Sequence, residues 1–163
     1  MVWANTQPYA GQETRDIASL SAQDIDDLVN GRGWGFAKAA ELNGFPGPAH
    51  ILELADELSL TAAQRHQVKE VFDRMNGKAR EIGVAFIEAE GALDAAFEVE
   101  TITAERLGEL TAQSGALRAK LRAVHLAAHL EVKPVLSRHQ IMIYNQARGY
   151  ADGEGHANHG HDQ

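Results

Sequence analysis

Two histidines four residues apart are the side chains of this sequence best suited to holding a metal ion. His125 and His129 fall in a helical pattern, where positions i and i+4 share one face with Cβ atoms about 6 Å apart. One ion can take a nitrogen from each ring. The residue after His125 is Leu126, so the pair lacks the glutamate that serves as general base in helical zinc proteases. We therefore expect a binding protein and not an enzyme.

A useful metal site needs a third ligand from another element. If the chain turns back near residue 100, facing positions sum to about 200, which places Met75 opposite His125. A short helix before the long ones carries His50 and Glu53. The sequence thus predicts that His50, His125 and His129 converge, with Met75 or Glu53 completing the shell. Neutral imidazoles suit copper(II), zinc, nickel or cobalt, so the ligands do not select the metal. No organic cofactor is expected.

The same side chains have structural interpretations that the sequence leaves open. Apolar residues surround both histidines of the pair, so the rings can be buried and hydrogen-bonded to carboxylates or backbone groups. A single His-x-x-x-His is more often structural than metal-binding. Met75 lies in an apolar seam and can be core filling, and Glu53 can be a solvated surface residue.

A second group of histidines lies near the C-terminus. Residues 151–163 are Gly-rich and polar and contain His156, His159 and His161. We expect this segment to be disordered. Three histidines in a flexible acidic tail can chelate a borderline metal ion weakly.

Two similar pentapeptides mark the starts of helices. They are Leu60-Thr61-Ala62-Ala63-Gln64 and Leu136-Ser137-Arg138-His139-Gln140. In each, the hydroxyl of Thr61 or Ser137 can accept from a free backbone amide, and Gln64 or Gln140 can reach back to the cap residue. Both pentapeptides therefore predict a capping box.

Heptad patterns predict two long helices between these boxes. Apolar residues recur at steps of three and four from Val68 to Ala96 and again from Leu107 to Ala128. The connection near 99–103, with Thr103 as a cap, makes the helices antiparallel. Shorter helices are expected after Ser21, over 36–42, from Pro48 to about residue 58, and after Ser137. We predict an all-α fold built on a long antiparallel helical hairpin, with an arm over 1–47, the hairpin domain over 48–150 and the tail over 151–163.

Composition excludes several classes of function. The chain has 163 residues, 44% of them hydrophobic but only 6% aromatic, which is typical of amphipathic helices. It has no cysteine, which excludes thiolate ligands and disulfides. The net charge of −8, without a basic stripe, argues against nucleic acid as a partner. No apolar run is long enough to span a membrane, and the first residues do not form a signal peptide.

The two boxes resemble the Leu-Thr-x-x-Gln motifs of the Spy/CpxP family, exported helical proteins that include chaperones and heavy-metal sensors or resistance proteins. The first box matches fully and the second has Ser137 in place of threonine. The resemblance covers about 49–150, with a weaker likeness over 9–44. It implies an elongated homodimer with a concave cradle and a periplasmic location. Metal-sensing members combine histidines of an early helix with a later His-x-x-x-His or His-x-x-x-Met, and His50 with the 125/129 pair is similar, although only one early histidine is present.

Two functions follow from these features. The sequence favours a metal-binding protein that senses, sequesters or confers resistance to heavy metals. The alternative is an ATP-independent chaperone that holds unfolded proteins in the cradle of the dimer. The resemblance also admits a membrane-bound signalling partner.

Overall fold

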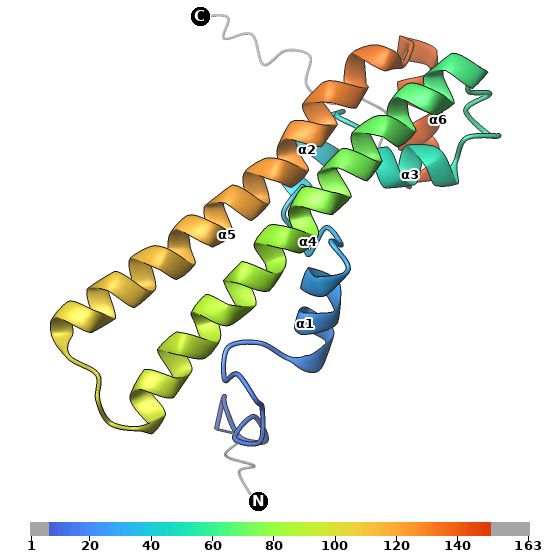
Figure 1. Cartoon of the computed structure of the whole chain (residues 1–163). Coiled ribbons are helices and arrows are strands. Elements are labelled where there is room, and N and C mark those ends of the chain that lie inside the picture. The colour runs from blue at the N-terminus through green and yellow to red at the C-terminus, as the bar shows by residue number, and fades with distance from the viewer. Residues whose placement is uncertain (1–6, 151–163) are drawn as a thin grey trace, which may run out of the picture. The chain divides into compact units, whose positions relative to one another are not determined.

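The structure, a computed structural model that describes residues 7–150, consists of helices joined by turns and loops, and the described residues contain one isolated bridge, between Ile17 and Leu20. In chain order the helices are α1 (Ala22–Val29), α2 (Lys38–Glu41), α3 (Pro48–Glu53), α4 (Ala62–Glu98), α5 (Ala104–Val132), a 3₁₀ turn (Lys133–Val135) and α6 (Arg138–Ala147) (Figure 1). The predicted all-α fold with a long helix pair is confirmed. No helix within the described residues is long and apolar enough to cross a lipid bilayer.

Side-chain caps set the helix starts. The Ser21 hydroxyl accepts from the Asp24 amide, and the Asp24 carboxylate accepts from the Ser21 amide, which forms a capping box at α1. Thr103 Oγ1 accepts from the Arg106 amide at the start of α5. Each cap satisfies amides that the first turn of a helix leaves without an intrahelical partner.

The helix that begins at Pro48 is shorter than expected. It ends at Glu53, whereas the sequence pattern predicted a helix to about residue 58. The chain continues in turns up to Ser59, which has a left-handed φ of 49°. The amides of Ser59 and Leu60 bond back to the carbonyls of Asp56 and Ala55 at 3.0 Å each. Ala55 and Leu58 are nevertheless buried, because these turns keep them on the core side.

The chain divides into two compact units, and each long helix contributes to both. Unit 1 comprises 7–34 and 76–123 of the described chain, and unit 2 comprises 35–75 and 124–150. The units therefore do not follow the predicted segments 1–47 and 48–150.

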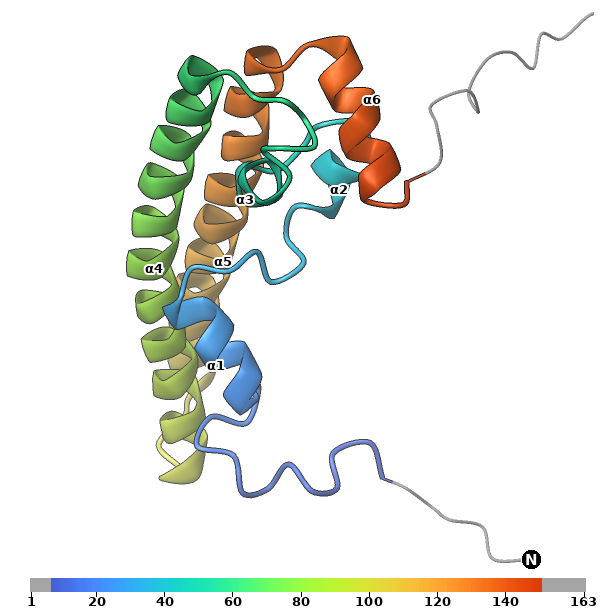
Figure 2. The ribbon, with the colours of Figure 1, turned by 90° about the vertical axis from the view of Figure 1, so that its right-hand side faces the viewer.

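In unit 1, α1 lies against α4 (Figures 1 and 2). The helices meet at Gly83 of α4, where an added Cβ would lie 2.5 Å from the Leu28 carbonyl oxygen. The Trp34 indole donates to Asp24 at 2.9 Å, its ring lies 5.9 Å from that of Phe86, and the Arg118 guanidinium lies 5.0 Å from the Trp34 ring. This cluster fixes the segment after α1.

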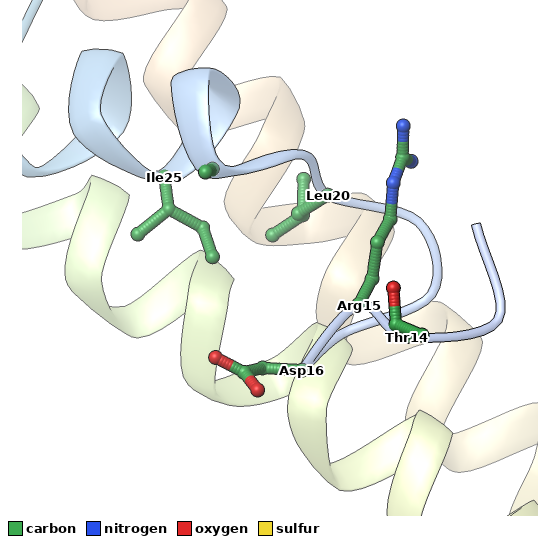
Figure 3. A pocket seen from close by; sticks show the side chains of 6 residues that line it. Thr14, Arg15, Asp16, Leu20 and Ile25 are labelled. Carbon is green, nitrogen blue, oxygen red and sulfur yellow. The ribbon is translucent and has the colours of Figure 1, made fainter. Parts of the chain in front are cut away.

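Unit 1 also has an open pocket of about 440 Å³ beside the start of α1. Its lining combines apolar residues with polar ones: Thr14, Arg15, Asp16, Leu20, Ala22 and Ile25. Figure 3 shows the Arg15 and Asp16 side chains pointing in different directions. Because the charged groups do not converge, we do not regard this pocket as the functional site.

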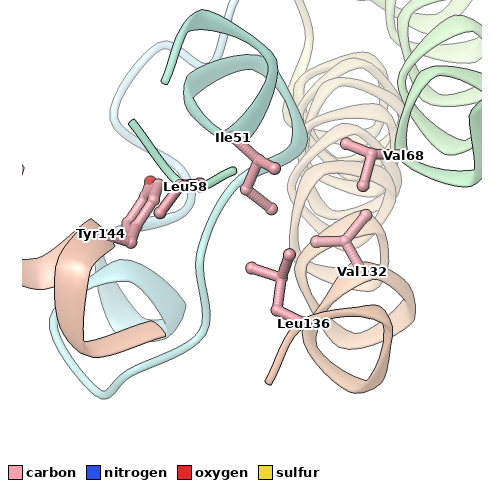
Figure 4. Close-up of a cluster of buried hydrophobic side chains, with 6 residues drawn as sticks. All are labelled: Ile51, Leu58, Val68, Val132, Leu136 and Tyr144. Carbon is pink, nitrogen blue, oxygen red and sulfur yellow. The ribbon is translucent and has the colours of Figure 1, made fainter. Parts of the chain in front are cut away.

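The core of unit 2 joins α3, the start of α4, the end of α5 and α6. Six buried apolar residues form it, namely Ile51, Leu58, Val68, Val132, Leu136 and Tyr144 (Figure 4). Helices α3 and α6 are too short to be stable alone, so the burial of these apolar side chains is the main source of their stability.

The heptad seams occupy the faces that the sequence predicted. From Val68 to Ala96 no seam residue is exposed, and from Leu110 to Ala128 the same is true. Leu107, at the start of the second seam, is 39% exposed. The seams are thus closed along most of their length and open at the 99–103 connection.

Candidate functional site

The His-x-x-x-His pair lies on α5 within unit 2. His125 and His129 are 5% and 7% exposed, because this face of α5 also buries Ala128 and Val132 in the core. The prediction that both rings share one helix face agrees with this burial. Their environments differ in hydrogen bonding.

The protonation of His129 follows from its contact with the backbone. Nδ1 lies 2.7 Å from the carbonyl oxygen of Phe45. A carbonyl can only accept, so the proton must be on Nδ1, and the neutral ring then has its lone pair on Nε2. The ring packs against Gly47, where a Cβ would lie 2.8 Å from His129 Cε1. Only glycine allows this approach.

His125 contains a buried nitrogen without a partner. Its ring centroid lies 6.3 Å from that of Phe36, and among the described residues nothing hydrogen-bonds to the buried Nε2. Burial and, to a smaller extent, the nearby His129 lower the pKa of His125. The ring is therefore neutral at neutral pH, which is the form that binds metals.

A buried carboxylate that the sequence did not single out lies beside His129. Glu41 Oε1 accepts from the hydroxyls of Tyr144 at 2.5 Å and Tyr150 at 3.1 Å, with Arg148 Nε at 3.6 Å. Oε2 lies 3.6 Å from His129 Nδ1 and has no hydrogen-bond partner within the described chain.

Tyr144 connects this carboxylate to the backbone before α3. Burial, together with Glu41, raises the pKa of Tyr144, so the phenol stays protonated and donates. Its oxygen also accepts from the Gly47 amide at 3.2 Å. Glu41 had no sequence signal, because its partners lie about a hundred positions further along the chain.

The remaining predicted ligands are placed elsewhere in unit 2. His50 Nδ1 lies 3.0 Å from Glu53 Oε2, and the Glu53 side chain is 68% exposed. Met75 is buried in the seam. Its neighbour Arg74 forms an ion pair with Glu131 of α5.

The predicted triad of His50, His125 and His129 is not assembled. Over 7–150 no group of three or more His, Cys, Asp or Glu side chains is arranged to hold a metal. The tail ligands His156, His159 and His161 lie outside the described residues.

The two capping boxes meet in unit 2. Thr61 Oγ1 accepts from the Gln64 amide and Ser137 Oγ from the Gln140 amide, while each glutamine Oε1 accepts from the cap amide. Each glutamine Nε2 also donates to the Oε1 of the other glutamine, at 2.9 Å and 3.0 Å. Further bonds from Gln64 to the Val135 carbonyl and from Gln140 to the Leu58 carbonyl complete the contact. The sequence predicted each cap, but not their pairing.

Comparison with known proteins found no matching family model, no matching curated protein and no matching solved structure. The resemblance to the Spy/CpxP family therefore depends on the residues of this chain alone.

Proposed function

We propose that this protein binds a divalent transition-metal ion through His125 and His129, as a metal-binding protein of the Spy/CpxP type. The observation that carries the proposal is the buried His125 Nε2 without a partner, one helical turn from a second imidazole. A buried polar atom left without a hydrogen bond costs about 1–3 kcal/mol. Coordination to a metal would remove that cost.

The state of both rings supports this proposal. His125 is neutral, and the Phe45 carbonyl holds the His129 proton on Nδ1, so that Nε2 is the free nitrogen. A backbone carbonyl that accepts from the second nitrogen of a histidine is the usual support for a metal ligand. The Phe45 carbonyl thus orients the His129 ring before any metal binds.

The remaining coordination positions require water or a side chain that moves on binding. Glu41 in α2 and His50 in α3 belong to the same unit as the histidine pair. Recruitment of either would tie a short helix to α5, and a metal-dependent change of this kind is what a sensor requires. With this function we propose the homodimer and the periplasmic location that the resemblance implies. We also propose the antiparallel hairpin that the heptad pattern predicts and the absence of catalysis expected from the missing general base.

Isothermal titration calorimetry of the full chain with zinc, copper(II), nickel and cobalt tests the proposal. We expect His125→Ala/His129→Ala to abolish the tight site while far-ultraviolet circular dichroism retains the helical signal. His66→Ala/His139→Ala is the matched control, because these two histidines are exposed. Unchanged binding by His125→Ala/His129→Ala would refute the site, and loss of binding only on replacing His156, His159 and His161 would assign it to the tail.

Chaperoning is the second candidate, and exposed apolar side chains favour it. Large apolar residues are exposed in both units, among them Leu42, Val84, Phe97, Val99, Leu130 and Met142. Such residues can hold an unfolded polypeptide loosely. We expect the protein to suppress aggregation of a denatured client in the presence of EDTA. Suppression that appears only with added metal would contradict this candidate.

A further inference from the structure

The net charge of the end of the helix pair around the 99–103 connection is strongly negative. Residues 88–109, which we call the acidic turn, contain seven carboxylates and one arginine, a net charge of −6 out of −8 for the whole chain. All of them belong to unit 1.

Few of these carboxylates are neutralised within the described structure. Glu90 accepts from the hydroxyls of Ser19 and Ser114, and Glu109 pairs with Arg106 at 2.8 Å. The other five have no hydrogen bond or ion pair among the described residues; they are Glu88, Asp94, Glu98, Glu100 and Glu105.

Two of the five lie where a negative charge is unfavourable. Glu98 is the last residue of α4, and Glu100 follows it, with no basic residue in the last helical turn. The C-terminus of a helix already has partial negative charge, so carboxylates there are repelled. A positive partner at this position relieves that repulsion.

An uncovered apolar layer lies between these charges. Glu90 of α4 touches Ser114 of α5, and one heptad further towards the connection these faces present Phe97 and Leu107. The chain turns back over 99–103 (Figure 1), so one heptad step from Glu90 and from Ser114 leads to the same end of the helix pair. Phe97 is 55% exposed, Leu107 39%, and the adjacent Val99 63%.

We propose that the acidic turn is a docking surface for a cationic amphipathic segment of a partner polypeptide. Apolar side chains of the segment cover Phe97, Val99 and Leu107, and its lysines or arginines pair with the surrounding carboxylates. The charge selects this occupant, since a neutral or acidic apolar segment would leave the five carboxylates unpaired or repelled. The inference does not depend on metal binding.

Fluorescence anisotropy with a labelled amphipathic peptide of leucine and lysine tests the proposal on the full chain in EDTA. Peptides of the same pattern with glutamine or glutamate in place of lysine are the comparison. We expect the lysine peptide to bind best and its affinity to fall as ionic strength rises, because exposed ion pairs are screened by salt.

Variants locate the binding. At low ionic strength we expect Glu98→Gln/Glu100→Gln/Glu105→Gln to weaken binding roughly tenfold, and Phe97→Ser/Leu107→Ser to weaken it by a similar factor. Matched controls elsewhere in the chain are the exposed pair Glu57→Gln/Glu81→Gln and Met142→Ser, which should bind as the parent protein does.

Two results would overturn the inference. Equal affinity for the lysine and glutamine peptides would show that the surface does not select by charge. That result would not contradict the proposal that the protein is a general chaperone. A dimer that dissociates in the Phe97→Ser/Leu107→Ser variant, by sedimentation, would show that a second copy of this chain covers the layer.

Discussion

Helix α1 approaches α4 closely at Gly83, and alanine at that position should push the two helices apart. A Cβ at Gly83 would lie 2.5 Å from the Leu28 carbonyl oxygen and 3.1 Å from its carbon. Ordinary carbon–oxygen contacts are about 3.3 Å or longer, so α1 would have to move by roughly 0.8 Å. Overpacking of this kind costs about 1–3 kcal/mol.

Gly77 in the same helix is the matched control, because a Cβ there has no atom within 4 Å. Alanine is favoured over glycine inside a helix by about 1 kcal/mol at either site. This gain cancels in the comparison, so Gly83→Ala should be less stable than Gly77→Ala by about 1–3 kcal/mol. Gly77→Ala alone should be more stable than the parent protein.

Urea unfolding followed by circular dichroism and by tryptophan fluorescence measures these differences. The midpoints report stability if the slope with denaturant is unchanged. If Gly83→Ala were as stable as Gly77→Ala, α1 could not be packed on α4 as observed.

Three further changes have defined outcomes. Gln64→Ala and Gln140→Ala should each lower the free energy of unfolding by about 0.5–2 kcal/mol, because each removes one cap bond. In a double-mutant cycle the two changes should show a coupling energy of at least about 0.5 kcal/mol, and additive effects would contradict the pairing of the two glutamines. Glu100 has a φ of 55° at a position that glycine normally fills, so Glu100→Gly should raise the free energy of unfolding by about 1 kcal/mol in urea titrations. Burial lowers the pKa of His125 from 6.5, so the unfolded chain binds its proton more tightly and stability should fall as pH drops below that value. In EDTA, the urea midpoint of His125→Leu should fall less than that of the parent protein as pH drops below 6.5. The same pH dependence in both proteins would refute the lowered pKa of His125.

Local signals in the sequence determined most helix boundaries. Ser21, Thr103 and Ser137 each precede a helix and cap it through an amide three residues ahead. Caps and heptads act over a few residues, so the one-dimensional pattern contains all the information they need. The predicted helix after Pro48 was too long, because Ala55 and Leu58 reach the core from turns as well as they would from a helix.

The environment of the histidines could not be read in the same way. Spacing placed His125 and His129 on one face of α5. The groups that define their chemistry, the Phe45 carbonyl, Gly47 and Glu41, come from a segment some eighty positions earlier. Such contacts depend on how α2 and the 45–48 segment pack, and no spacing rule encodes that.

Nitrogen-15 NMR of the histidine rings tests metal binding by this pair most directly. The spectrum of the metal-free protein should show a proton on His129 Nδ1, as the contact with the Phe45 carbonyl requires. One equivalent of zinc should then shift the Nε2 resonances of both His125 and His129, while His129 Nδ1 keeps its proton. If these resonances stay unchanged while only His156, His159 and His161 shift, the buried pair does not bind the metal.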